Sequence, residues 1–484
     1  MLPARVVDEG SVNPVLEHDS SFIDGRWLPA HGKLTTVIDP ATEEVAGTFV
    51  SAGEADVDAA VAAARRAFPG WSALPVDDRL AHLDAIADGI AARQSEFAEL
   101  ITTEMGAPAK LASRVHVQLP VSVLRGHREF AAEVVGEERL GNSLVIKEPV
   151  GVVAAITPWN YPLHQIIAKV APALLAGCTI VVKPSDDAPL SAFLLARVVQ
   201  EAGLPAGVFN LITGAQETGS HLVAHPGVDL VSFTGSTATG RAIARTCGDL
   251  VRPVILELGG KSANVVLPDA DLAVAVKVGV ANAFLNAGQT CNSWTRLVVP
   301  RDRHDEVLQM CEALAASYTV GDPRDSATRL GPLVTAAHRE RVLGHMTAAL
   351  DDGARLVAGG PARPDGLDVG FYVRPTVVAG AEPGSRIAQQ EVFGPVLTVL
   401  PYADEEHALQ IANDSTYGLG GAVWSADQDR ATAFARRLQT GQIDINGGTF
   451  NPLAPFGGQK CSGIGREFGP YGVREFLRTK SLQF

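Results

Sequence analysis

The stretch CTIVVKPSDDAPLSAFLLARVVQEAGLPAGVFNLIT, residues 178–213, has the pattern that decides the fold. Its ends, 178–183 and 207–213, are short runs rich in apolar and β-branched residues, and the segment 189–203 between them is a longer run rich in alanine and leucine. The short runs predict buried strands and the longer run predicts a helix. A strand, a crossover helix and a second strand form the repeating unit of a parallel sheet that is covered on both faces. We therefore predict a doubly wound α/β domain.

The same alternation continues on both sides of this stretch. Further strands are predicted at 151–157, 229–235 and 253–260. Two helical segments precede the first of them, at 54–68 and 77–95. A second series of short apolar runs predicts another α/β unit, with strands at 296–300, 375–380 and 396–402.

Composition and charge limit the classes of function. With 484 residues, of which 46% are hydrophobic, the chain is long enough for two or three domains that each have their own core. The net charge of −14 argues against a nucleic-acid partner, which would normally meet a basic face. No run of about 18 apolar residues predicts a membrane span. Small-molecule chemistry is the better expectation.

The cysteines indicate a reducing compartment. The five cysteines are widely separated, so they form neither a C-x-x-C pair nor a zinc-binding spacing, and their odd number disfavours a complete disulfide framework. The first 20 residues lack the basic region and the apolar region of a signal peptide. We expect a cytoplasmic protein without a bound metal.

Three familiar active-site motifs are absent. No G-x-G-x-x-G follows any predicted strand, and GGKS at 259–262 is not a P-loop because Ile255 stands where that motif needs its first glycine. Neither G-x-S-x-G nor H-E-x-x-H occurs. The sequence therefore has no standard dinucleotide loop. It also gives little support for an ATPase, a serine hydrolase or a zinc enzyme.

The stretch NAGQTCNSWTR, residues 286–296, holds a single cysteine, Cys291, after an apolar segment that predicts a helix. Most free cysteines are buried and behave as small hydrophobic residues. The glycine just before this one, however, predicts a turn in which the backbone can approach a ligand closely. On local pattern alone, both readings stay open.

Seven separated motifs decide between them: PWNYP (158–162), KPSDD (183–187), FTGST (233–237), ELGGKS (257–262), GQTC (288–291), EVFGPV (391–396) and PFGGQKCSGIGRE (455–467). In this order and at these spacings the chain resembles the NAD(P)-dependent aldehyde dehydrogenase family. The resemblance runs from FIDGRW (22–27) to TKSLQF (479–484), nearly the whole chain. It implies that the chain oxidises an aldehyde to a carboxylic acid with NAD and water.

The resemblance implies specific roles in that reaction. Cys291 is the expected nucleophile, which forms a thiohemiacetal and, after hydride transfer to the nicotinamide, a thioester. Glu257 is the expected general base for the hydrolytic water, and the apolar residues around it in ILELGG would raise its pKa. Asn160 is the expected oxyanion donor, together with the backbone N–H of Cys291. Lys169 and Glu467 are implied in proton relay, although charged residues are more often solvated surface groups.

The resemblance also implies the cofactor site. Lys183 would bind the adenosine ribose, Ser236 would contact the pyrophosphate, and Thr234 would lie near the nicotinamide. Glu391 and Phe393 would clamp the nicotinamide ribose. Further cofactor contacts are implied for Ile156, Trp159, Gly235 and Leu258. Ser236 with Gly235 also fits an ordinary helix N-cap, which is the more economical local reading.

Some positions depart from the family pattern. Asp186 stands where a glutamate is usual, which puts the choice between NAD and NADP in doubt; we expect NAD. Asp187 is a competing candidate for the carboxylate that discriminates between them. Gln390 replaces a frequent glutamate, with little expected effect. Tyr161 and Phe456 fall where many members build an aromatic substrate tunnel, whereas Ala168 replaces a frequent tryptophan, which implies a wider or differently shaped tunnel.

By resemblance the fold has three parts. A Rossmann-like NAD-binding domain would comprise 1–126 and 148–256, a catalytic α/β domain 257–453, and a bridging and oligomerisation segment 127–147 with 468–484. In the last segment SLVIKEP alternates like a strand, and Gly141–Asn142 fits a turn. A protruding ribbon buries its apolar face poorly alone, so a homodimer or homotetramer is expected.

Two alternatives remain. A CoA-acylating semialdehyde dehydrogenase would pass the acyl group to CoA instead of water, but it would not need the water-activating Glu257. A catalytically silent scaffold relative would keep the fold and the cofactor, but intact Cys291, Glu257 and Asn160 argue against it.

Overall fold

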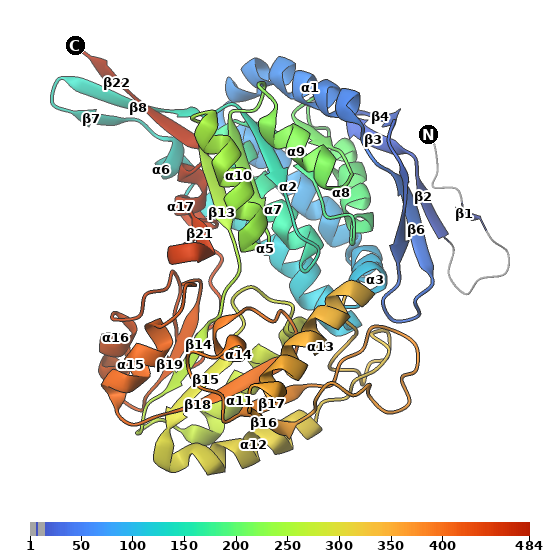
Figure 1. Ribbon diagram of the computed structural model, residues 1–484. Coiled ribbons are helices and arrows are strands. Elements are labelled where there is room, and N and C mark those ends of the chain that lie inside the picture. The colour runs from blue at the N-terminus through green and yellow to red at the C-terminus, as the bar shows by residue number, and fades with distance from the viewer. Residues whose placement is uncertain (1–5, 8–14) are drawn as a thin grey trace.

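The protein is described by a computed structural model, which covers residues 6–7 and 15–484. Figure 1 shows two α/β bodies, one above the other, and a thin ribbon that projects from the upper body and holds the C-terminus. Each body is built around its own sheet.

The upper body holds an eight-stranded sheet in the order β21-β13-β12-β9-β10-β11-β3-β4. Its five central strands are parallel to one another, and they are β9 (Val152–Ile156), β10 (Thr179–Lys183), β11 (Phe209–Leu211), β12 (Leu230–Thr234) and β13 (Val254–Glu257). Antiparallel strands complete both edges, namely β3 (Ser20–Ile23), β4 (Arg26–Pro29) and β21 (Gly463–Ile464). The five strands predicted in this region are confirmed.

Both faces of this sheet are buried, which explains the continuous apolar runs in the sequence. Side chains alternate along each strand: Val152 and Ala154 pack into one core, and Val153 and Ala155 pack into the opposite one. The first core lies under α1 (Glu54–Ser72), α9 (Gln216–Ala224) and α10 (Thr237–Asp249). The second lies under α2 (Val76–Ala92), α3 (Gln94–Met105), α5 (Gln118–Gly126), α7 (Pro162–Ala176) and α8 (Leu190–Glu201).

The lower body repeats the architecture with a seven-stranded sheet in the order β16-β17-β18-β15-β14-β19-β20. All of its strands are parallel except β16, and the set is β14 (Ala263–Val266), β15 (Arg296–Pro300), β16 (Arg355–Ala358), β17 (Thr376–Ala379), β18 (Val396–Tyr402), β19 (Gly421–Trp424) and β20 (Asp444–Ile445). Its longer helices are α11 (Leu272–Ala283), α12 (His304–Ala316), α13 (Ala336–Asp351), α15 (Glu405–Asn413) and α16 (Gln428–Ala435). The predicted second α/β unit is therefore present.

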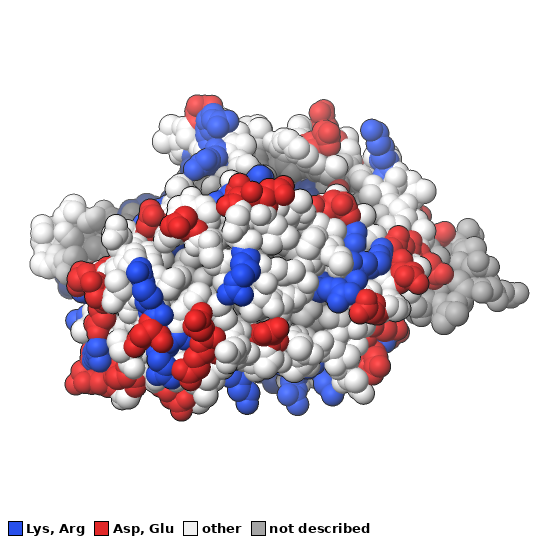
Figure 2. All heavy atoms as spheres, turned by 60° about the horizontal axis from the view of Figure 1, so that its bottom comes forward, with Lys and Arg blue, Asp and Glu red and all other residues white. Residues whose placement is uncertain are grey.

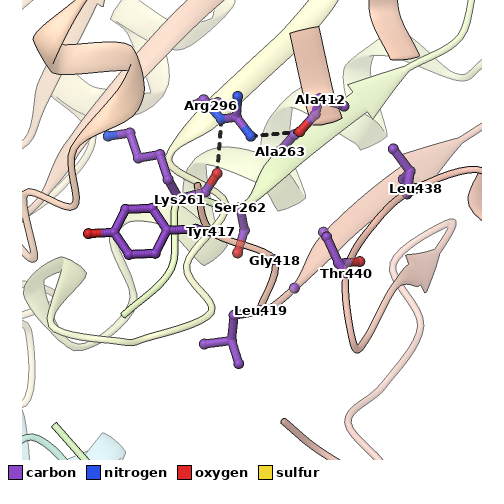
Figure 3. Close-up of a pocket in the computed structure, with 12 residues that line it drawn as sticks. Lys261, Ser262, Ala263, Arg296, Ala412, Tyr417, Gly418, Leu419, Leu438 and Thr440 are labelled. Atoms are coloured by element: carbon purple, nitrogen blue, oxygen red, sulfur yellow. Dashed lines mark hydrogen bonds between the residues drawn. The ribbon is translucent and has the colours of Figure 1, made fainter. Parts of the chain in front are cut away.

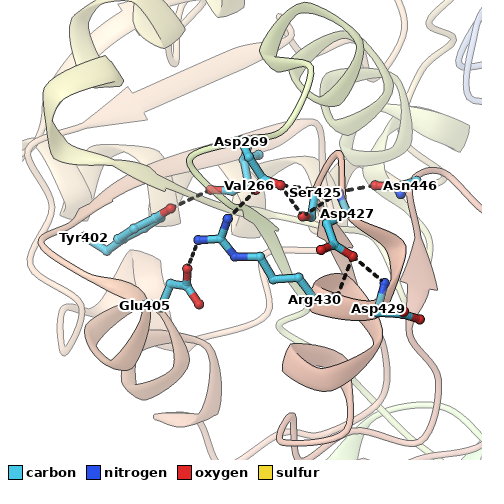
Figure 4. Close-up of polar contacts among 9 residues, drawn as sticks. All are labelled: Val266, Asp269, Tyr402, Glu405, Ser425, Asp427, Asp429, Arg430 and Asn446. Carbon is cyan, nitrogen blue, oxygen red and sulfur yellow. Dashed lines mark hydrogen bonds and ion pairs between the residues drawn. The ribbon is translucent and has the colours of Figure 1, made fainter.

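Polar contacts hold the helices of the lower body to its sheet. Arg430 of α16 pairs with Glu405 at the start of α15 and lies 3.1 Å from a carboxylate oxygen of Asp269, which follows β14 (Figure 4). Asp427 caps the first turn of α16 by accepting hydrogen bonds from two backbone N–H groups.

The projecting ribbon is a three-stranded sheet of β7 (Glu138–Leu140), β8 (Ser143–Pro149) and β22 (Leu477–Gln483). β8 and β22 pair antiparallel over seven residues, and the predicted turn at Gly141–Asn142 joins β7 to β8. A separate four-stranded sheet contains β1 (Val6–Val7), β2 (Val15–His18), β5 (Leu34–Ile38) and β6 (Val45–Val50). The boundaries of the three predicted domains stay predictions, and residues 1–5 and 8–14 of the first one lie outside the described chain.

Short helices connect these elements: α4 (Ala109–Leu111), α6 (Ala131–Val135), α14 (Arg386–Gln389), α17 (Gly469–Arg474), the π-helix η1 (Ala112–Val117) and the 3₁₀ helices η2 (His127–Glu129), η3 (Leu285–Gly288), η4 (Arg301–Arg303) and η5 (Lys460–Ser462). Among the helices of the described residues, none is long and apolar enough to cross a membrane. On the face that Figure 2 shows, acidic and basic side chains are interspersed.

Candidate active site

The turn before Cys291 has an unusual backbone. After α11, three consecutive residues, Asn286, Ala287 and Gly288, have positive φ angles of 54°, 55° and 72°. This left-handed conformation costs non-glycine residues roughly 1–2 kcal/mol each. Hydrogen bonds offset that cost, because Gln289 Nε2 donates to Asn286 O at 3.1 Å and Asn286 Nδ2 donates to Asn160 O at 2.9 Å. The predicted helix-to-turn transition is present, and the turn holds Cys291 in one place.

Gly288 lets this turn pack closely against the backbone at Gly394, which precedes β18. A Cβ at Gly288 would lie 2.0 Å from the carbonyl oxygen of Gly394, and its φ of +72° disfavours any side chain. We expect Gly288→Ala to lower kcat/KM by about tenfold or more, because a misplaced nucleophile reacts far more slowly. The control is Gly344→Ala on α13, since a Cβ there meets nothing within 4 Å. Steady-state kinetics and thermal melts check this, and parent-like kinetics in Gly288→Ala would contradict it.

Cys291 itself is half-buried. Loss of solvent raises the pKa of its thiol well above the usual 9.0, and the nearby negative charge of Glu257 raises this pKa further. The thiol therefore rests in its protonated form and needs a base to become a nucleophile.

Glu257 stands at the end of β13 and is 2% exposed. Within the described chain, neither of its carboxylate oxygens has a hydrogen-bond partner. Burial raises its pKa well above the usual 4.5, and the charge of Glu467 raises it further, while the charge of Lys169 opposes both. A carboxylate without donors in a desolvated position is a stronger base than an ordinary glutamate.

Lys169 and Glu467 are buried and not solvated, with exposures of 1% and 5%. Lys169 Nζ lies 2.5 Å from Glu467 Oε1 and donates to Thr234 Oγ1 at 2.7 Å. Lys169 belongs to α7, Thr234 ends β12, and Glu467 comes from the C-terminal segment. Since the charges of both Lys169 and Glu467 act on the pKa of Glu257, the structure brings the predicted relay pair next to the predicted base.

Asn160 lies against the nucleophile turn. Its Nδ2 donates to the carbonyl oxygen of Gln289 at 3.0 Å, which leaves the second amide hydrogen free to donate. The N–H of Cys291 donates to no protein acceptor among residues 15–484. These two donors are the pair predicted for the oxyanion.

The predicted cofactor residues gather at the carboxyl ends of the parallel strands of the upper body. Lys183 pairs with Ile156 and Thr234 pairs with Glu257 at the last positions of their strands. Ligands of open α/β sheets bind at this edge. Lys183 Nζ lies 3.7 Å from Asp186 Oδ1, and burial lowers the pKa of Lys183 while it raises the pKa of Asp186.

The next helix start suits a phosphate. Ser236 caps α10, and its Oγ accepts a hydrogen bond from Thr239 N at 3.2 Å. Gly235 donates its N–H to Glu257 O at 3.0 Å, and Leu258 packs against Gly240 of the same helix. The local N-cap reading of Ser236 is therefore correct, and the unpaired N–H groups of such a helix start can also receive a phosphate.

The lower body contributes Glu391 and Phe393. Glu391 Oε1 accepts from Gly260 N at 3.1 Å, and burial raises the pKa of Glu391 to about 7. A Cβ at Gly259 would lie 2.3 Å from Glu391 Oε2, so a side chain here would displace the carboxylate of Glu391. Phe393 has a positive φ of 59°, and its ring stands edge-on to Trp159 at 5.5 Å. A strand-edge lysine, a capped helix start and a carboxylate on a glycine turn together fit a dinucleotide.

The structure adds neighbours that the sequence did not reveal. His338 of α13 forms a hydrogen bond with Phe393 O through Nε2 at 2.7 Å, and its ring is tilted against that of Trp159 with a centroid distance of 5.2 Å. His116 and His164 lie beside Tyr161. None of the three belongs to a recognisable motif, because contact between distant helices and loops created each placement.

A small pocket beside the ELGGKS turn is lined by Lys261, Arg296, Tyr417 and their neighbours (Figure 3). Arg296 donates to Lys261 O and Ala412 O, each at 2.9 Å, and so fixes the end of this turn. Burial lowers the pKa of Lys261 to about 7.

Two α/β sheets, with a half-buried cysteine and a buried glutamate brought together beside them, are a framework that fits a dinucleotide-dependent α/β enzyme. The chain belongs to the aldehyde dehydrogenase family, whose sequence profile matches residues 27–482. This membership confirms the predicted family, fold class and enzyme class.

Individual relatives are similar over their full length. A 3-succinoylsemialdehyde-pyridine dehydrogenase of Pseudomonas sp is 47% identical over 95% of this chain and 97% of its own. A geranial dehydrogenase of Castellaniella defragrans is 44% identical over 96% of this chain and 99% of its own. The structure of a variant of aldehyde dehydrogenase C of Pseudomonas syringae, solved with NAD+ and octanal, superimposes on this one with a TM-score of 0.95. The two sequences are 44% identical, and the match covers 99% of this chain and 98% of the other.

Proposed function

We propose that this chain oxidises aldehydes to carboxylic acids with NAD and water, with Cys291 as the nucleophile. The observation that carries the proposal is the juxtaposition of the Cys291 thiol with Glu257, a carboxylate that is 2% exposed and whose charge acts on the pKa of that thiol. The geranial and octanal in the names of relatives support an aldehyde substrate. The test is the appearance of NADH absorbance when protein, NAD and a panel of aldehydes are mixed, with and without CoA.

In the first step Glu257 takes the proton of the Cys291 thiol, and the sulfur adds to the carbonyl carbon. The carbonyl oxygen becomes an oxyanion that accepts hydrogen bonds from the N–H of Cys291 and from Asn160. Removing one such donor typically costs about 10²–10³ in rate. When bound, NAD supplies the acceptor for the hydride that leaves the substrate carbon.

In the second step Glu257 takes a proton from water, which attacks the thioester carbon. The carbon–sulfur bond breaks, the acid departs, and the sulfur of Cys291 recovers a proton. Lys169 and Glu467 touch each other beside Glu257, so they can carry its proton away and return it to the base form.

NAD would be held at both ends by groups of this chain. Lys183 and Asp186 would bind the adenosine ribose, with Ile156 nearby. Ser236 and Gly235 would receive the pyrophosphate at the start of α10. Thr234, Leu258, Glu391, Phe393 and Trp159 would surround the nicotinamide and its ribose.

We expect a preference for NAD over NADP that depends on Asp186. A carboxylate at the ribose accepts a hydrogen bond from the 2′-hydroxyl and repels a 2′-phosphate. At about 5 Å and an effective dielectric of about 20, the repulsion is roughly 3 kcal/mol before screening. Discrimination of about 10- to 100-fold follows, because Lys183 lies beside Asp186 and offsets part of the repulsion.

The measurement is kcat/KM for NAD and NADP in the parent, in Asp186→Ser and in Asp187→Ser. Asp187 is the matched control, because it is adjacent in sequence but exposed. A parent that favours NADP, or a ratio that moves in Asp187→Ser and not in Asp186→Ser, contradicts the assignment.

The two alternatives are separated by the same aldehyde panel. Faster turnover with CoA, and acyl-CoA as the product, would indicate the CoA-acylating reaction. NAD binding without turnover on any aldehyde would indicate a scaffold relative. The unpartnered Glu257 favours the hydrolytic reaction over both.

The remaining proposals concern assembly and location. We propose three domains with the predicted boundaries, a homodimer or homotetramer formed through the β7-β8-β22 ribbon, and a cytoplasmic setting. The ribbon supports assembly because it projects from the body and because one edge of β22 pairs with no other strand of residues 6–7 and 15–484. Light scattering of the intact protein tests it: a monomer at micromolar concentration would contradict it.

A further inference from the structure

Phe393, one of the two residues expected to clamp the nicotinamide ribose, has a strained backbone. Its φ of +59° lies in the left-handed region, which bulky residues rarely adopt. A residue keeps such a conformation only where the surrounding structure enforces it, and many of these residues lie at functional sites. The contacts that hold Phe393 therefore bear on the cofactor site.

His338 of α13 forms a hydrogen bond with the backbone of Phe393. Its Nε2 lies 2.7 Å from Phe393 O, and since a carbonyl oxygen only accepts, Nε2 must carry the proton. Arg341 Nη2, one turn further along α13, lies 3.0 Å from Nδ1 of the same ring. A guanidinium only donates, so Nδ1 must be the unprotonated nitrogen. The two contacts require the same neutral tautomer, and Arg341 fixes it.

The surroundings favour this neutral form. The side chain of His338 is buried, and burial with the charge of Arg341 lowers its pKa to about 4, against the opposing effect of the bond to Phe393. Arg341 also acts on Glu391, the other residue of the expected clamp: burial raises the pKa of Glu391, and the charge of Arg341 opposes that rise. One turn of α13 thus acts on both clamp residues.

Three aromatic rings pack together at this point. The ring centroid of His338 lies 5.2 Å from that of Trp159 and 6.0 Å from that of Phe393, and the rings of Trp159 and Phe393 stand edge-on at 5.5 Å. Trp159 immediately precedes Asn160, the expected oxyanion donor. His338 therefore contacts both the loop after β9 and the segment before β18.

Gly394, the residue after Phe393, is packed just as closely. A Cβ at Gly394 would lie 2.7 Å from Val342 Cγ1 of α13, and a Cβ at Gly288 would lie 2.0 Å from Gly394 O. The segment that contains Phe393 is therefore in contact with both α13 and the turn before Cys291. A shift of Phe393 has little free space to go unnoticed by the reacting groups.

We propose that His338 is a positioning residue for hydride transfer: its bond to Phe393 O and its ring contacts hold the nicotinamide clamp in place, and Arg341 fixes its tautomer. The inference rests on the proposed function, since it assumes that Phe393 contacts the nicotinamide end of NAD. Lys183 and Asp186 would still bind the adenosine end. Loss of His338 therefore misplaces the nicotinamide without preventing NAD from binding.

The test measures hydride transfer apart from hydrolysis in the intact enzyme. Enzyme with saturating NAD is mixed rapidly with a smaller amount of the aldehyde that the parent oxidises fastest, so that NADH forms in a single turnover. His338→Phe keeps a ring but cannot donate to Phe393 O. We expect its rate constant for NADH formation to fall about tenfold or more, because a misplaced reacting group reacts far more slowly.

Three readouts distinguish this effect from a merely structural one. In His338→Phe the amplitude of NADH formation and the dissociation constant for NAD should stay near those of the parent. Deuterium on the carbonyl carbon of the aldehyde should slow NADH formation in the variant, because hydride transfer limits that step. His338→Gln should regain most of the rate, since its amide nitrogen can donate from about the position of Nε2.

Two further variants complete the set. Arg341→Met removes the group that fixes the tautomer, and because Arg341 is exposed the variant should fold; its rate constant should fall severalfold. The matched control is His345→Phe, about two turns further along α13, where a half-buried histidine is replaced in the same way. Its rate constant should equal that of the parent.

The outcomes separate the inference from the reaction itself. A parent-like rate constant in His338→Phe overturns the inference, as does a loss that His338→Gln does not recover. A lower amplitude with an unchanged rate constant indicates a structural role only and also overturns it. If His338→Phe does not fold, an unchanged rate constant in Arg341→Met overturns it instead. Failure of the parent to form NADH from any aldehyde overturns the proposed function.

Discussion

Replacement of Cys291 by alanine is expected to abolish NADH formation from every aldehyde while NAD binding remains near that of the parent. Among the described neighbours of Glu257, the thiol is the group that we expect to add to the carbonyl carbon, and without this bond the substrate carbon has no tetrahedral form from which hydride can leave. Steady-state rates should fall to the detection limit. Fluorescence or calorimetric titration with NAD shows whether the cofactor site is intact.

The other cysteines provide matched controls. Cys178 and Cys311 are buried, and burial raises the pKa of each thiol to about 12, so neither is a nucleophile. Cys461 is half-exposed like Cys291 and accepts a hydrogen bond from Arg241 at 3.3 Å. Cys461→Ala should keep most of the activity. Substantial turnover in Cys291→Ala would mean that the covalent route is wrong for this protein.

The substitution Glu257→Gln is expected to slow thioester hydrolysis much more than hydride transfer. The amide keeps the shape of the side chain but cannot take a proton from water. Rapid mixing should therefore show a burst of about one NADH per active site, followed by slow turnover. Gln390→Glu is a useful comparison, because Gln390 is exposed and its change should leave the burst pattern of the parent.

In the parent, the rate of thioester hydrolysis is expected to fall as the pH is lowered. Because the pKa of Glu257 is raised, its base form is lost at a higher pH than for an ordinary glutamate, and hydrolysis should decline as pH falls through that raised value. Above it the carboxylate is available and the rate is maintained. If Glu257→Gln kept the parent's steady-state rate from neutral to mildly alkaline pH, Glu257 would have no part in hydrolysis.

The fold could be predicted because its signals are local. Each central strand of the upper body is a short apolar run, and both of its faces are buried, so the pattern in 178–213 appears directly in β10, α8 and β11. The turn after α11 was likewise visible from its glycine. Local sequence is enough to predict the structure of a segment whose conformation depends mainly on its own residues.

The details of the site depend on contacts between distant segments. Lys169 and Glu467 are 298 residues apart, and nothing near either one indicates that they are buried as a pair. The π-helix at His116 and the left-handed conformation of Asn286 and Ala287 also leave no clear pattern, because neither follows from residue preferences. Most roles at the site could be expected only from the resemblance to the family, and the histidines around Tyr161 not at all.

The short strand β21 has a consequence for how the enzyme comes into being. Ile464 and Gly463 pair with Leu256 and Glu257, and Ser462 O accepts the N–H of Leu258, so the strand that carries Glu257 gains its outer neighbour only from the end of the chain. During synthesis on the ribosome, the upper sheet can form long before this segment emerges. The base would then sit on an open edge, with Lys169 still unpaired. A chain that ends before this segment would lack both the outer neighbour of β13 and the partner of Lys169, so we expect it to be inactive.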